Sequence, residues 1–336
     1  MAAPEGALPF ITVCMPVRNE ERYVGATLRE LLDQDYPQDR FEIIVADGGS
    51  TDRTREIVAD FCAKRPQVKL FQNPKGLSSA GRNIGFKNGK GDIFLVVDGH
   101  CFIGHDQLLR NIVAAFEKSG AQCLGRPQPI DPPGLSDFQK AVALARASRI
   151  GHGGDSLIYS DYEGFVSPVS HGAVYKREIF EKIGFVDETF DVCEDVDFNY
   201  RVEKAGFKTY MSPSIAIRYF PRESLAALWR QMVRYGKGRF RFLKKHPETF
   251  SLLGLAPAIL AAAVFLLPLL GGASSFFLKL FGVGYGVYLM TVLLVSFMIA
   301  VKSEFKYFSR LPLIFICIHF GLGVGFLAGT FGSREG

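Results

Sequence analysis

Three long apolar stretches near the carboxyl end constrain the fold of this chain more than any other feature. They cover residues 252–270, 280–301 and 311–331, and none of them contains a charge, although Lys279 lies at the edge of the second. Each approaches or exceeds the roughly 20 residues that an α-helix needs to cross a bilayer. We therefore expect a membrane domain of residues 250–336 with three transmembrane helices.

A basic segment, residues 222–249, precedes the first apolar stretch. Eight Lys or Arg residues lie between Arg222 and His246 against one acid, and Trp229 and other apolar residues are interleaved with them. This pattern is typical of an amphipathic helix on an anionic membrane surface, although a solvated charged helix would also produce it. The connection 302–310 is basic and the connection 271–275 is uncharged, so the positive-inside rule places the basic segment in the cytoplasm.

The remaining residues, 1–221, alternate between two patterns. Short apolar runs at 10–15, 41–46, 68–71 and 94–98 are separated by segments with apolar residues at helical spacing. This alternation predicts βαβ units, hence an α/β domain with a mostly parallel sheet and flanking helices. The six scattered cysteines show no metal-ligand spacing, which favours free thiols. A net charge of +5 gives little support for nucleic-acid binding.

The apolar run at 94–98 ends abruptly in Asp98, Gly99 and His100. Ligands of open α/β sheets bind beyond the carboxyl ends of the strands, so Asp98 and His100 are candidates to bind a metal or a phosphate. Taken alone, the same residues would also fit a plain turn with an exposed histidine. Further motifs in the chain bear on this choice.

Four other motifs follow strands or open helices in a consistent order. They are Pro16-Val17-Arg18-Asn19-Glu20, Asp47-Gly48-Gly49-Ser50-Thr51-Asp52, Ser79-Ala80-Gly81-Arg82-Asn83-Ile84-Gly85, and Glu194-Asp195. Together with Asp98-Gly99-His100 they resemble the motifs of family 2 glycosyltransferases with a GT-A fold. The resemblance covers roughly residues 10–240 and is strongest to membrane-anchored enzymes of succinoglycan and exopolysaccharide biosynthesis. Gly48 and His100 each replace an Asp of the family pattern.

This resemblance implies roles for individual residues. Asp195 would be the general base that accepts the proton of the acceptor hydroxyl, although acidic residues are also favoured at a helix N-terminus for its dipole alone. The nucleotide-sugar would contact Pro16, Asn19, Glu20, Asp47, Gly49, Arg82 and Asp98. Acceptor or diphosphate would contact His171, Gly172, Arg177, Glu194, Gln231 and Arg234. The last two belong to a motif like QxxRW with Tyr235 for Trp, and Arg234 could equally bind lipid headgroups.

The resemblance also implies a divalent metal, held by Asp98 and His100, that neutralises the diphosphate leaving group. Carboxylate ligands favour Mg²⁺ or Mn²⁺, and the imidazole in place of a carboxylate shifts the preference toward Mn²⁺. We therefore expect Mn²⁺ or Mg²⁺ as the cofactor.

The sequence thus predicts a multi-pass protein of the cytoplasmic (inner) membrane, with its catalytic domain in the cytoplasm. The predicted reaction is inverting transfer from a UDP-sugar to a lipid-linked (polyprenyl) saccharide, with other glycan-assembly proteins as further candidate partners. One alternative is a glycosyltransferase whose acceptor is the polyprenyl phosphate itself, and another is a processive synthase. A third alternative, of a different class, is an inactive GT-A domain that serves a glycan-export complex as a binding partner.

Overall fold

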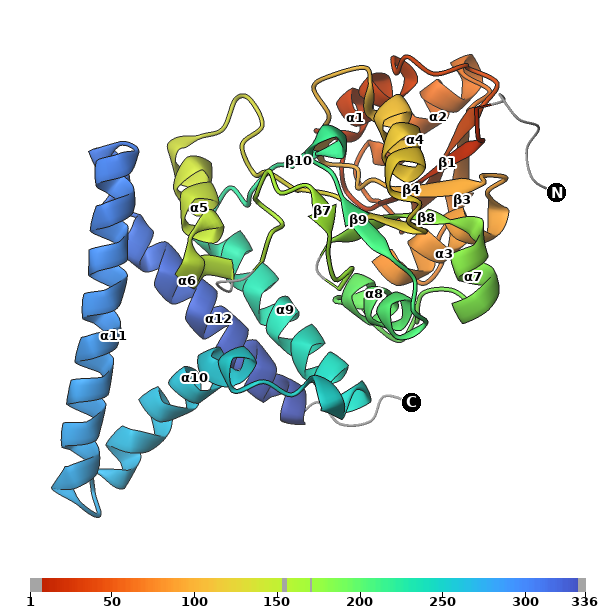
Figure 1. The fold of residues 1–336 in the computed structure, drawn as a ribbon. Coiled ribbons are helices and arrows are strands. Elements are labelled where there is room, and N and C mark those ends of the chain that lie inside the picture. Colours follow the sequence, from red (N-terminus) through yellow and green to blue (C-terminus); the bar gives the residue numbers. More distant parts are fainter. Residues whose placement is uncertain (1–7, 153–155, 170, 332–336) are drawn as a thin grey trace. The chain divides into compact units, whose positions relative to one another are not determined.

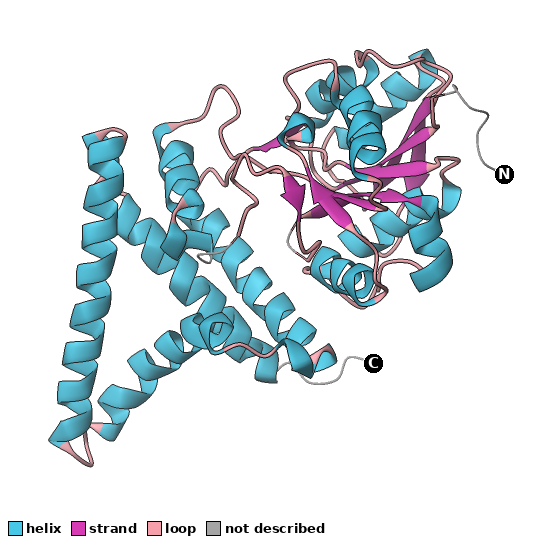
Figure 2. Cartoon of the chain, viewed as in Figure 1, coloured by secondary structure: helices cyan, strands magenta, loops and turns pink. Residues whose placement is uncertain are grey.

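A computed structural model describes residues 8–152, 156–169 and 171–331 of the chain. The chain forms two compact units (Figures 1 and 2). The first contains residues 1–132 and 156–220, and the second contains residues 133–155 and 221–336. Residues 133–152 lie within the predicted 1–221 domain but pack with the second unit. The further boundaries at 222 and 250 stay predictions.

The first unit is built on a sheet of eight strands among the described residues, in the order β3-β2-β1-β4-β8-β6-β9-β7. Neighbouring strands from β3 to β4 are parallel, β8 is antiparallel to both β4 and β6, and β6 is parallel to β9. The strands are β1 (Ile11–Val17), β2 (Phe41–Asp47), β3 (Val68–Gln72), β4 (Ile93–Val96), β6 (Cys123–Gly125), β7 (Gly164–Phe165), β8 (Gly172–Lys176) and β9 (Thr209–Met211). The prediction of a mostly parallel sheet with flanking helices is confirmed.

Helices cover both faces of this sheet, as Figure 2 shows. They are α1 (Val24–Leu32), α2 (Thr54–Lys64), α3 (Ser78–Asn88), α4 (Leu108–Ser119), α7 (Arg177–Ile183) and α8 (Glu194–Lys204). A two-stranded sheet pairs β5 (Cys101–Phe102) with β10 (Arg218–Tyr219). Every residue of β2 is buried, as expected for a strand covered on both faces. The core is therefore divided between the two sides of the sheet.

Two boundaries differ from the sequence prediction for clear reasons. We predict that Pro16 ends the first strand, but β1 continues to Val17. The Val97 N–H donates to the Cys14 carbonyl, so the peptide groups of Cys14 face β4. Those of Pro16, two residues later, face the same side, but β4 ends at Val96. The missing N–H of Pro16 therefore removes no ladder hydrogen bond. We also expect Asn19 to cap the first helix, but α1 begins at Val24, because Asn19 is used in contacts between loops.

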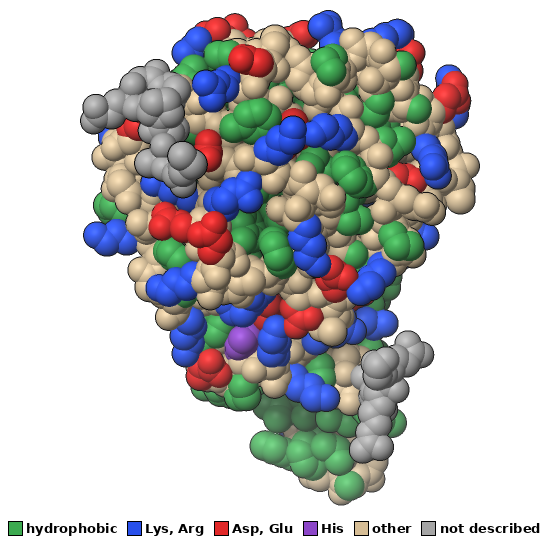
Figure 3. Space-filling view, turned by 90° about the vertical axis from the view of Figure 1, so that its right-hand side faces the viewer, with side chains coloured by type: hydrophobic (Ala, Val, Ile, Leu, Met, Phe, Trp, Pro, Cys, Tyr) green, Lys and Arg blue, Asp and Glu red, His purple; other side chains and the backbone are tan. Residues whose placement is uncertain are grey.

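The second unit is helical. It consists of α5 (Asp137–Ala147), α6 (Arg149–His152), α9 (Leu225–Lys245), α10 (Leu252–Leu270), α11 (Ser275–Lys302) and α12 (Leu311–Phe331). By length and composition, α10, α11 and α12 are each able to cross a membrane. Hydrophobic side chains gather at the lower end of the view in Figure 3, where the turn between α10 and α11 lies. The predicted apolar helices are thus present, and α11 is longer than predicted because it begins before Lys279.

Candidate active site

The loops that follow β1 and β2 are joined through Asn19. Its backbone N–H donates to Ser50 Oγ, and its side-chain Oδ1 accepts from the Thr51 N–H, both over 2.9 Å. Asn19 adopts a left-handed backbone with φ of 56°, a conformation that Asn tolerates better than most residues. The N–H of Glu20 also donates to Thr54 Oγ1. These contacts hold the first two predicted nucleotide loops as one surface at the carboxyl edge of the sheet.

Asp47 ends β2 at this edge and is 2% exposed. Its carboxylate accepts a hydrogen bond from the Ser50 N–H at 3.2 Å. Gly49 between them has φ of +79°, a left-handed conformation that strains other residues. The tight turn therefore explains why position 49 is a glycine. Pro16, predicted to contact the nucleotide, lies in β1, where its ring packs against Gly81 of α3.

The loop after β4 is clamped onto α1. Thr27 Oγ1 donates toward the carbonyls of Gly99 and Cys101 and accepts from the Cys101 N–H. A Cβ at Gly99 would lie 3.0 Å from Val17 Cγ1, so this residue must be small for the loop to approach β1. The predicted metal ligands Asp98 and His100 therefore stand on a braced turn. Asp98 is half-buried at this turn.

His100 is in contact with Glu20 of the first loop. Its Nδ1 lies 2.8 Å from Glu20 Oε1, and its ring meets Tyr219 edge-on at 6.0 Å between centroids. Glu20, predicted to bind the nucleotide, thus contacts a predicted metal ligand. A carboxylate on one imidazole nitrogen fixes the orientation of the ring, as it commonly does for histidines that ligate metals.

Arg126 is a buried cation at the same edge that the sequence prediction missed. It follows β6, is 1% exposed, and donates from Nη1 to the Val96 carbonyl and from Nη2 to Tyr219 Oη. Its Nε has no hydrogen-bond partner among the described residues. The sequence did contain a signal for Arg126, because this arginine directly follows an apolar strand in the way that Asp98 follows β4. Burial raises the pKa of Tyr219, with Arg126 opposing and the Asp98 carboxylate reinforcing that shift.

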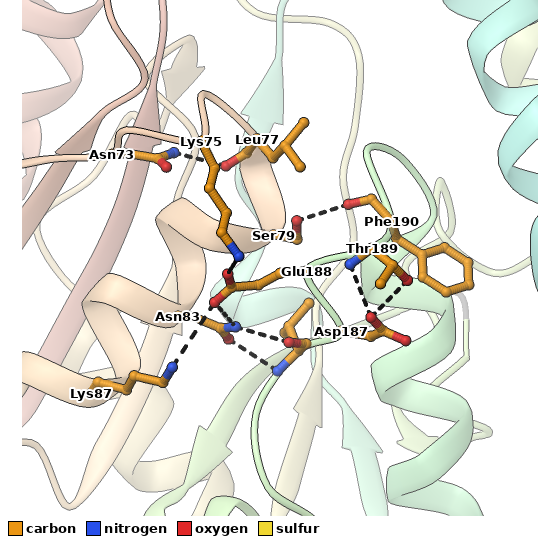
Figure 4. Close-up of polar contacts among 11 residues, drawn as sticks. Asn73, Lys75, Leu77, Ser79, Asn83, Lys87, Asp187, Glu188, Thr189 and Phe190 are labelled. Atoms are coloured by element: carbon orange, nitrogen blue, oxygen red, sulfur yellow. Dashed lines mark hydrogen bonds and ion pairs between the residues drawn. The ribbon is translucent and has the colours of Figure 1, made fainter. Parts of the chain in front are cut away.

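The loop before α8 is fastened to α3, which sets where Glu194 and Asp195 lie (Figure 4). Asn83 Nδ2 donates to the Val186 carbonyl at 2.8 Å and to Glu188 Oε1 at 2.7 Å, while its Oδ1 accepts from the Val186 N–H. Ser79 Oγ donates to the Phe190 carbonyl at 2.7 Å. Asn83 and Ser79 of the predicted nucleotide motif therefore position α8 through these buried contacts.

Arg82, between these two anchors, faces the start of α8. Its Nη2 lies 3.4 Å from Glu194 Oε1, and the side chains are 14% and 6% exposed. Burial alone would lower the pKa of the Arg82 guanidinium, but the carboxylates of Glu194, Asp195 and Asp98 raise it above its ordinary value. Burial raises the pKa of the Glu194 carboxyl, and Arg82 opposes that shift. Arg82 therefore stays charged and joins the loop after β4 electrostatically to the start of α8.

Asp195 is half-buried in the first turn of α8, whereas the neighbouring Asp197 is fully buried. Asp197 accepts from Arg201 Nε at 3.1 Å one helical turn later, which identifies it as part of the framework. The residue before α8, Cys193, has φ of 63°, so the chain reverses sharply where Glu194 and Asp195 begin. Backbone strain of this kind is concentrated at functional sites.

His171 and Gly172 lie at the carboxyl edge of β6, beside Arg126. The Arg126 N–H donates to the His171 carbonyl, and burial lowers the pKa of the His171 imidazole. Its Nε2 is buried and has no hydrogen-bond partner among the described residues. Gly172 packs against Asn199 so closely that a Cβ there would overlap the Asn199 amide. The structure brings these two predicted acceptor residues to the same edge as Asp98.

Arg177 lies at the opposite edge of the sheet, so its predicted place in the acceptor site is wrong. It follows Lys176, which pairs with Ile93 at the start of β4. Asp98 lies five residues after Ile93, a separation of about 16 Å at the rise of a strand. Arg177 donates to the Gly89 carbonyl and covers the Phe94 ring at 5.0 Å. Its role is packing, because β8 runs antiparallel to β4 and carries the residue away from the site.

Gln231 and Arg234 lie on α9 in the second unit. Gln231 Nε2 donates to Tyr235 Oη at 3.3 Å, and Arg234 is exposed. Their predicted contact with the diphosphate stays a prediction.

The donor atoms near Asp98 fit a metal that is shared with a substrate. Among the described residues, no cluster of three or more His, Cys, Asp or Glu side chains is placed to hold an ion. Asp98 and His100 supply one carboxylate and one imidazole. Cations such as Mg²⁺ are commonly bound by one or two protein groups together with substrate phosphates. The residues present therefore suit an ion that binds with a nucleoside diphosphate.

A mostly parallel sheet with acidic and basic loops gathered at its carboxyl edge is the arrangement expected of a GT-A domain. The sequence profile of "Glycosyl transferase family 2" matches residues 12–184, and that of "Glycosyl transferase family group 2" matches residues 105–328. The chain belongs to glycosyl transferase family 2. The resemblance noted in its motifs is confirmed.

Two relatives extend over most of the chain. A Methanococcus voltae protein named dolichyl N-acetyl-alpha-D-glucosaminyl phosphate 3-beta-D-2,3-diacetamido-2,3-dideoxy-beta-D-glucuronosyltransferase is 27% identical over 95% of this chain and 97% of its own. The succinoglycan biosynthesis protein ExoA of Rhizobium meliloti is 31% identical over 75% of this chain and 76% of its own.

A solved structure shares the fold. The mannosyltransferase PcManGT from Pyrobaculum calidifontis, in complex with GDP-Man and Mn²⁺, has a TM-score of 0.61 at 17% identity and covers 94% of this chain and 88% of its own. The GT-A fold class predicted from the sequence is therefore confirmed.

Proposed function

We propose that this glycosyltransferase inverts configuration and moves a sugar from a UDP-sugar to a lipid-linked saccharide at the cytoplasmic face of a membrane. The observation that carries the proposal is the arrangement around Arg82. Three carboxylates, Asp98, Glu194 and Asp195, act on its guanidinium from two separate segments of the chain. A site for group transfer needs such a combination, because one group must bind the leaving phosphate and another must accept a proton.

Asp195 is the candidate general base. It lies in the first turn of α8 and is half-buried, so an acceptor hydroxyl can reach its carboxylate. Glu194 is directed at Arg82 and is nearly inaccessible, which leaves it to hold the guanidinium in place. In the proposed step, Asp195 takes the proton of the acceptor hydroxyl while the hydroxyl oxygen attacks the anomeric carbon from the face opposite the nucleotide. The bond from that carbon to the diphosphate oxygen breaks at the same time, and the nucleoside diphosphate leaves with the bonding electrons.

The donor would lie across the two joined loops. Asp47 is available at the end of β2 to accept a hydrogen bond from the base, and Arg82 is charged beside Asp98, where the diphosphate would be. Asp98 and His100 would hold a divalent ion, Mn²⁺ or Mg²⁺, which when bound neutralises the nucleoside diphosphate as it departs. The complex of the mannosyltransferase neighbour with GDP-Man and Mn²⁺ supports the proposal that a nucleotide-sugar and a divalent ion bind at this edge of the sheet.

The relatives and the second unit support a lipid-linked acceptor. The name of the Methanococcus relative specifies a dolichyl-linked sugar phosphate, and that of the Rhizobium relative specifies succinoglycan biosynthesis. The apolar helices α10 to α12 give the chain a means of staying at a membrane. The basic connections 222–249 and 302–310 support a cytoplasmic catalytic unit in an inner membrane.

The test is transfer by membranes that contain the full chain. Radiolabelled UDP-sugars and GDP-sugars are supplied with Mn²⁺ or Mg²⁺, and with either polyprenyl phosphate or polyprenyl-linked saccharides as acceptor. We expect product only with a saccharide acceptor, and loss of that product in Asp195→Asn with UDP binding retained. Transfer to bare polyprenyl phosphate that persists in Asp195→Asn would establish the phosphate as acceptor instead. UDP binding without turnover on any donor would show an inactive binding partner.

A further inference from the structure

A surface groove on the first unit lies outside the residues assigned to the site so far. It has a volume of about 350 Å³ and forms where β7 and the loop after it face the end of α8 and the beginning of β9 (Figure 1). Ligand sites for small molecules have volumes of roughly 300–1,000 Å³ and combine apolar walls with a few polar groups. The lining of this groove has that composition and includes Phe165, Ser167, Pro168, Glu203, Phe207 and Lys208.

Phe165 forms an aromatic wall that is held in place and yet exposed. It pairs with Tyr210 across β7 and β9, and the two rings meet edge-on at 5.4 Å between centroids. The next residue, Val166, donates its N–H to the Thr209 carbonyl. The Phe165 side chain is nevertheless 55% exposed. A ring that the sheet already orders can contact a ligand with little further loss of conformational entropy.

The opposite wall of the groove is aromatic as well, and its rim is charged. Phe207 is half-buried, with the Lys182 ammonium 4.8 Å from its ring centroid. Glu203 and Lys208 are exposed, and neither side chain has a hydrogen-bond or ion-pair partner among the described residues. A sugar ring matches these walls, because its faces carry C–H groups and its edge carries hydroxyls that a carboxylate accepts from and an ammonium donates to. An acyl chain would leave both charges unused.

The groove adjoins the predicted acceptor residues His171 and Gly172. The Pro168 carbonyl, on the groove wall, accepts from the N–H groups of both, at 2.9 and 2.8 Å. His171 Nδ1 lies 3.4 Å from the Ser167 carbonyl, so Nδ1 is the donor nitrogen and Nε2 the acceptor. His171 is 8% exposed, and its buried Nε2 has no partner among the residues that the structure describes. A ligand with hydroxyl donors suits this end of the groove.

The helix α8 connects the groove to the proposed base. Asp195, Asn199 and Glu203 follow one another at intervals of four residues, so they lie on one face of the helix. Asn199 Nδ2 donates to the Gly172 carbonyl at 3.1 Å, which turns this face toward His171 and Gly172. Glu203 lies about 12 Å beyond Asp195 along the helix axis, at 1.5 Å per residue. An acceptor that reaches from Asp195 into the groove must therefore be longer than one sugar.

We propose that this groove binds the sugars of the acceptor that precede the one receiving the transferred sugar. The inner sugars stack on Phe165, and their hydroxyls contact Glu203 and Lys208. The inference rests on the proposed transfer to a lipid-linked saccharide and adds that this saccharide is an oligosaccharide. Because the groove belongs entirely to the first unit, its occupancy can be measured without turnover.

A fluorescent probe in the groove tests binding directly. Trp229 is the one tryptophan of the chain, so Trp229→Phe with Phe165→Trp places a single indole at the aromatic wall of the full-length, detergent-solubilised protein. Three probes are added in turn: polyprenyl-linked saccharides extracted from native membranes, the same saccharides released from the lipid by mild acid, and polyprenyl phosphate. We expect the emission to change with the first two and not with the third.

The matched control is Trp229→Phe with Phe185→Trp. Phe185 is also an exposed aromatic residue, 37% exposed, but its ring faces the Lys87 ammonium and does not line the groove. Its emission should not respond to any of the three probes. A response at position 165 to polyprenyl phosphate but not to released saccharides would show that the groove binds lipid. That result, or silence toward all three probes, would overturn the proposal.

Steady-state kinetics provide the second test. Phe165→Ala should raise the KM for the saccharide acceptor about tenfold, because an aromatic contact is lost, and leave kcat and the KM for the donor unchanged. Phe185→Ala should leave all three constants unchanged. Equal acceptor KM values in the two variants would contradict the groove while leaving the proposed transfer intact. Absence of transfer in the unmodified chain, with the emission response to saccharides retained, would instead contradict the proposed function alone.

Discussion

The imidazole of His100 and the carboxylate of Glu20 are held in contact, with Nδ1 and Oε1 2.8 Å apart. The two residues come from the loops after β4 and β1, and the turn at Gly99 is what allows those loops to meet. Where the family pattern has a second aspartate, this chain therefore has a histidine backed by a carboxylate. A metal held through Nε2 would see a neutral ligand whose orientation is set by Glu20.

The first prediction concerns that pair. Glu20→Gln keeps the size of the side chain and removes its charge, so the imidazole loses a strong acceptor. We expect the affinity for Mn²⁺ in the presence of UDP to fall about 10- to 100-fold, the usual effect of losing such a partner. Calorimetric titration of the detergent-solubilised protein measures it. His100→Asp, the matched exchange, should raise the affinity for Mg²⁺ relative to Mn²⁺, and an unchanged Mn²⁺ affinity in Glu20→Gln would refute the arrangement.

The second prediction separates two aspartates that lie two residues apart. Asp195→Asn removes the proposed base, and we expect kcat to fall about 10²- to 10⁴-fold with thermal stability unchanged. Asp197→Asn weakens the buried contact with Arg201 and should lower the free energy of unfolding by on the order of 3 kcal/mol. Transfer assays and thermal unfolding are run on both variants. The roles assigned here are wrong if Asp195→Asn destabilises the protein and Asp197→Asn does not.

The third prediction concerns Arg126, whose guanidinium joins the end of β4 to Tyr219. Arg126→Met leaves the Val96 carbonyl without this donor and should cost about 1–3 kcal/mol of stability. Because Val96 directly precedes the Asp98 turn, we also expect weaker UDP binding. Tyr219→Phe removes only one of the two hydrogen bonds and is the control. Its smaller effect on both stability and UDP affinity would support a positioning role for Arg126, and equal effects would contradict it.

Much of the fold was predictable because it depends on local patterns. The apolar runs predicted β1 to β4, and the carboxyl-edge rule placed Asp98 and His100 at the site. Contacts between distant loops left no such pattern. Glu20 and His100 are separated by 80 residues, and Arg126 stands before a proline-rich segment whose helix α5 was not predicted. Arg177 was misplaced because a motif does not show that its strand runs antiparallel.

The last prediction uses the clamp between α3 and the loop before α8. Glu188 accepts from Asn83 at 2.7 Å and from Lys75 at 2.7 Å, and these hydrogen bonds hold the pKa of its carboxyl below the ordinary value. A carboxyl whose pKa is lower in the folded state stabilises the protein above its unfolded pKa, near 4.5. That contribution is lost as the pH falls through the folded pKa.

Glu188→Gln should therefore reduce stability at neutral pH and leave a smaller loss of stability between pH 5 and pH 3 than the unmodified chain shows. Thermal unfolding measured across this range in detergent detects the difference. Glu56→Gln is the control, because Glu56 also has a lowered pKa, held by Arg53, but lies on the surface of α2. Since the clamp positions Asp195, Glu188→Gln should also lower kcat, whereas Glu56→Gln should not. Equal kcat in both variants would show that the clamp does not position the base.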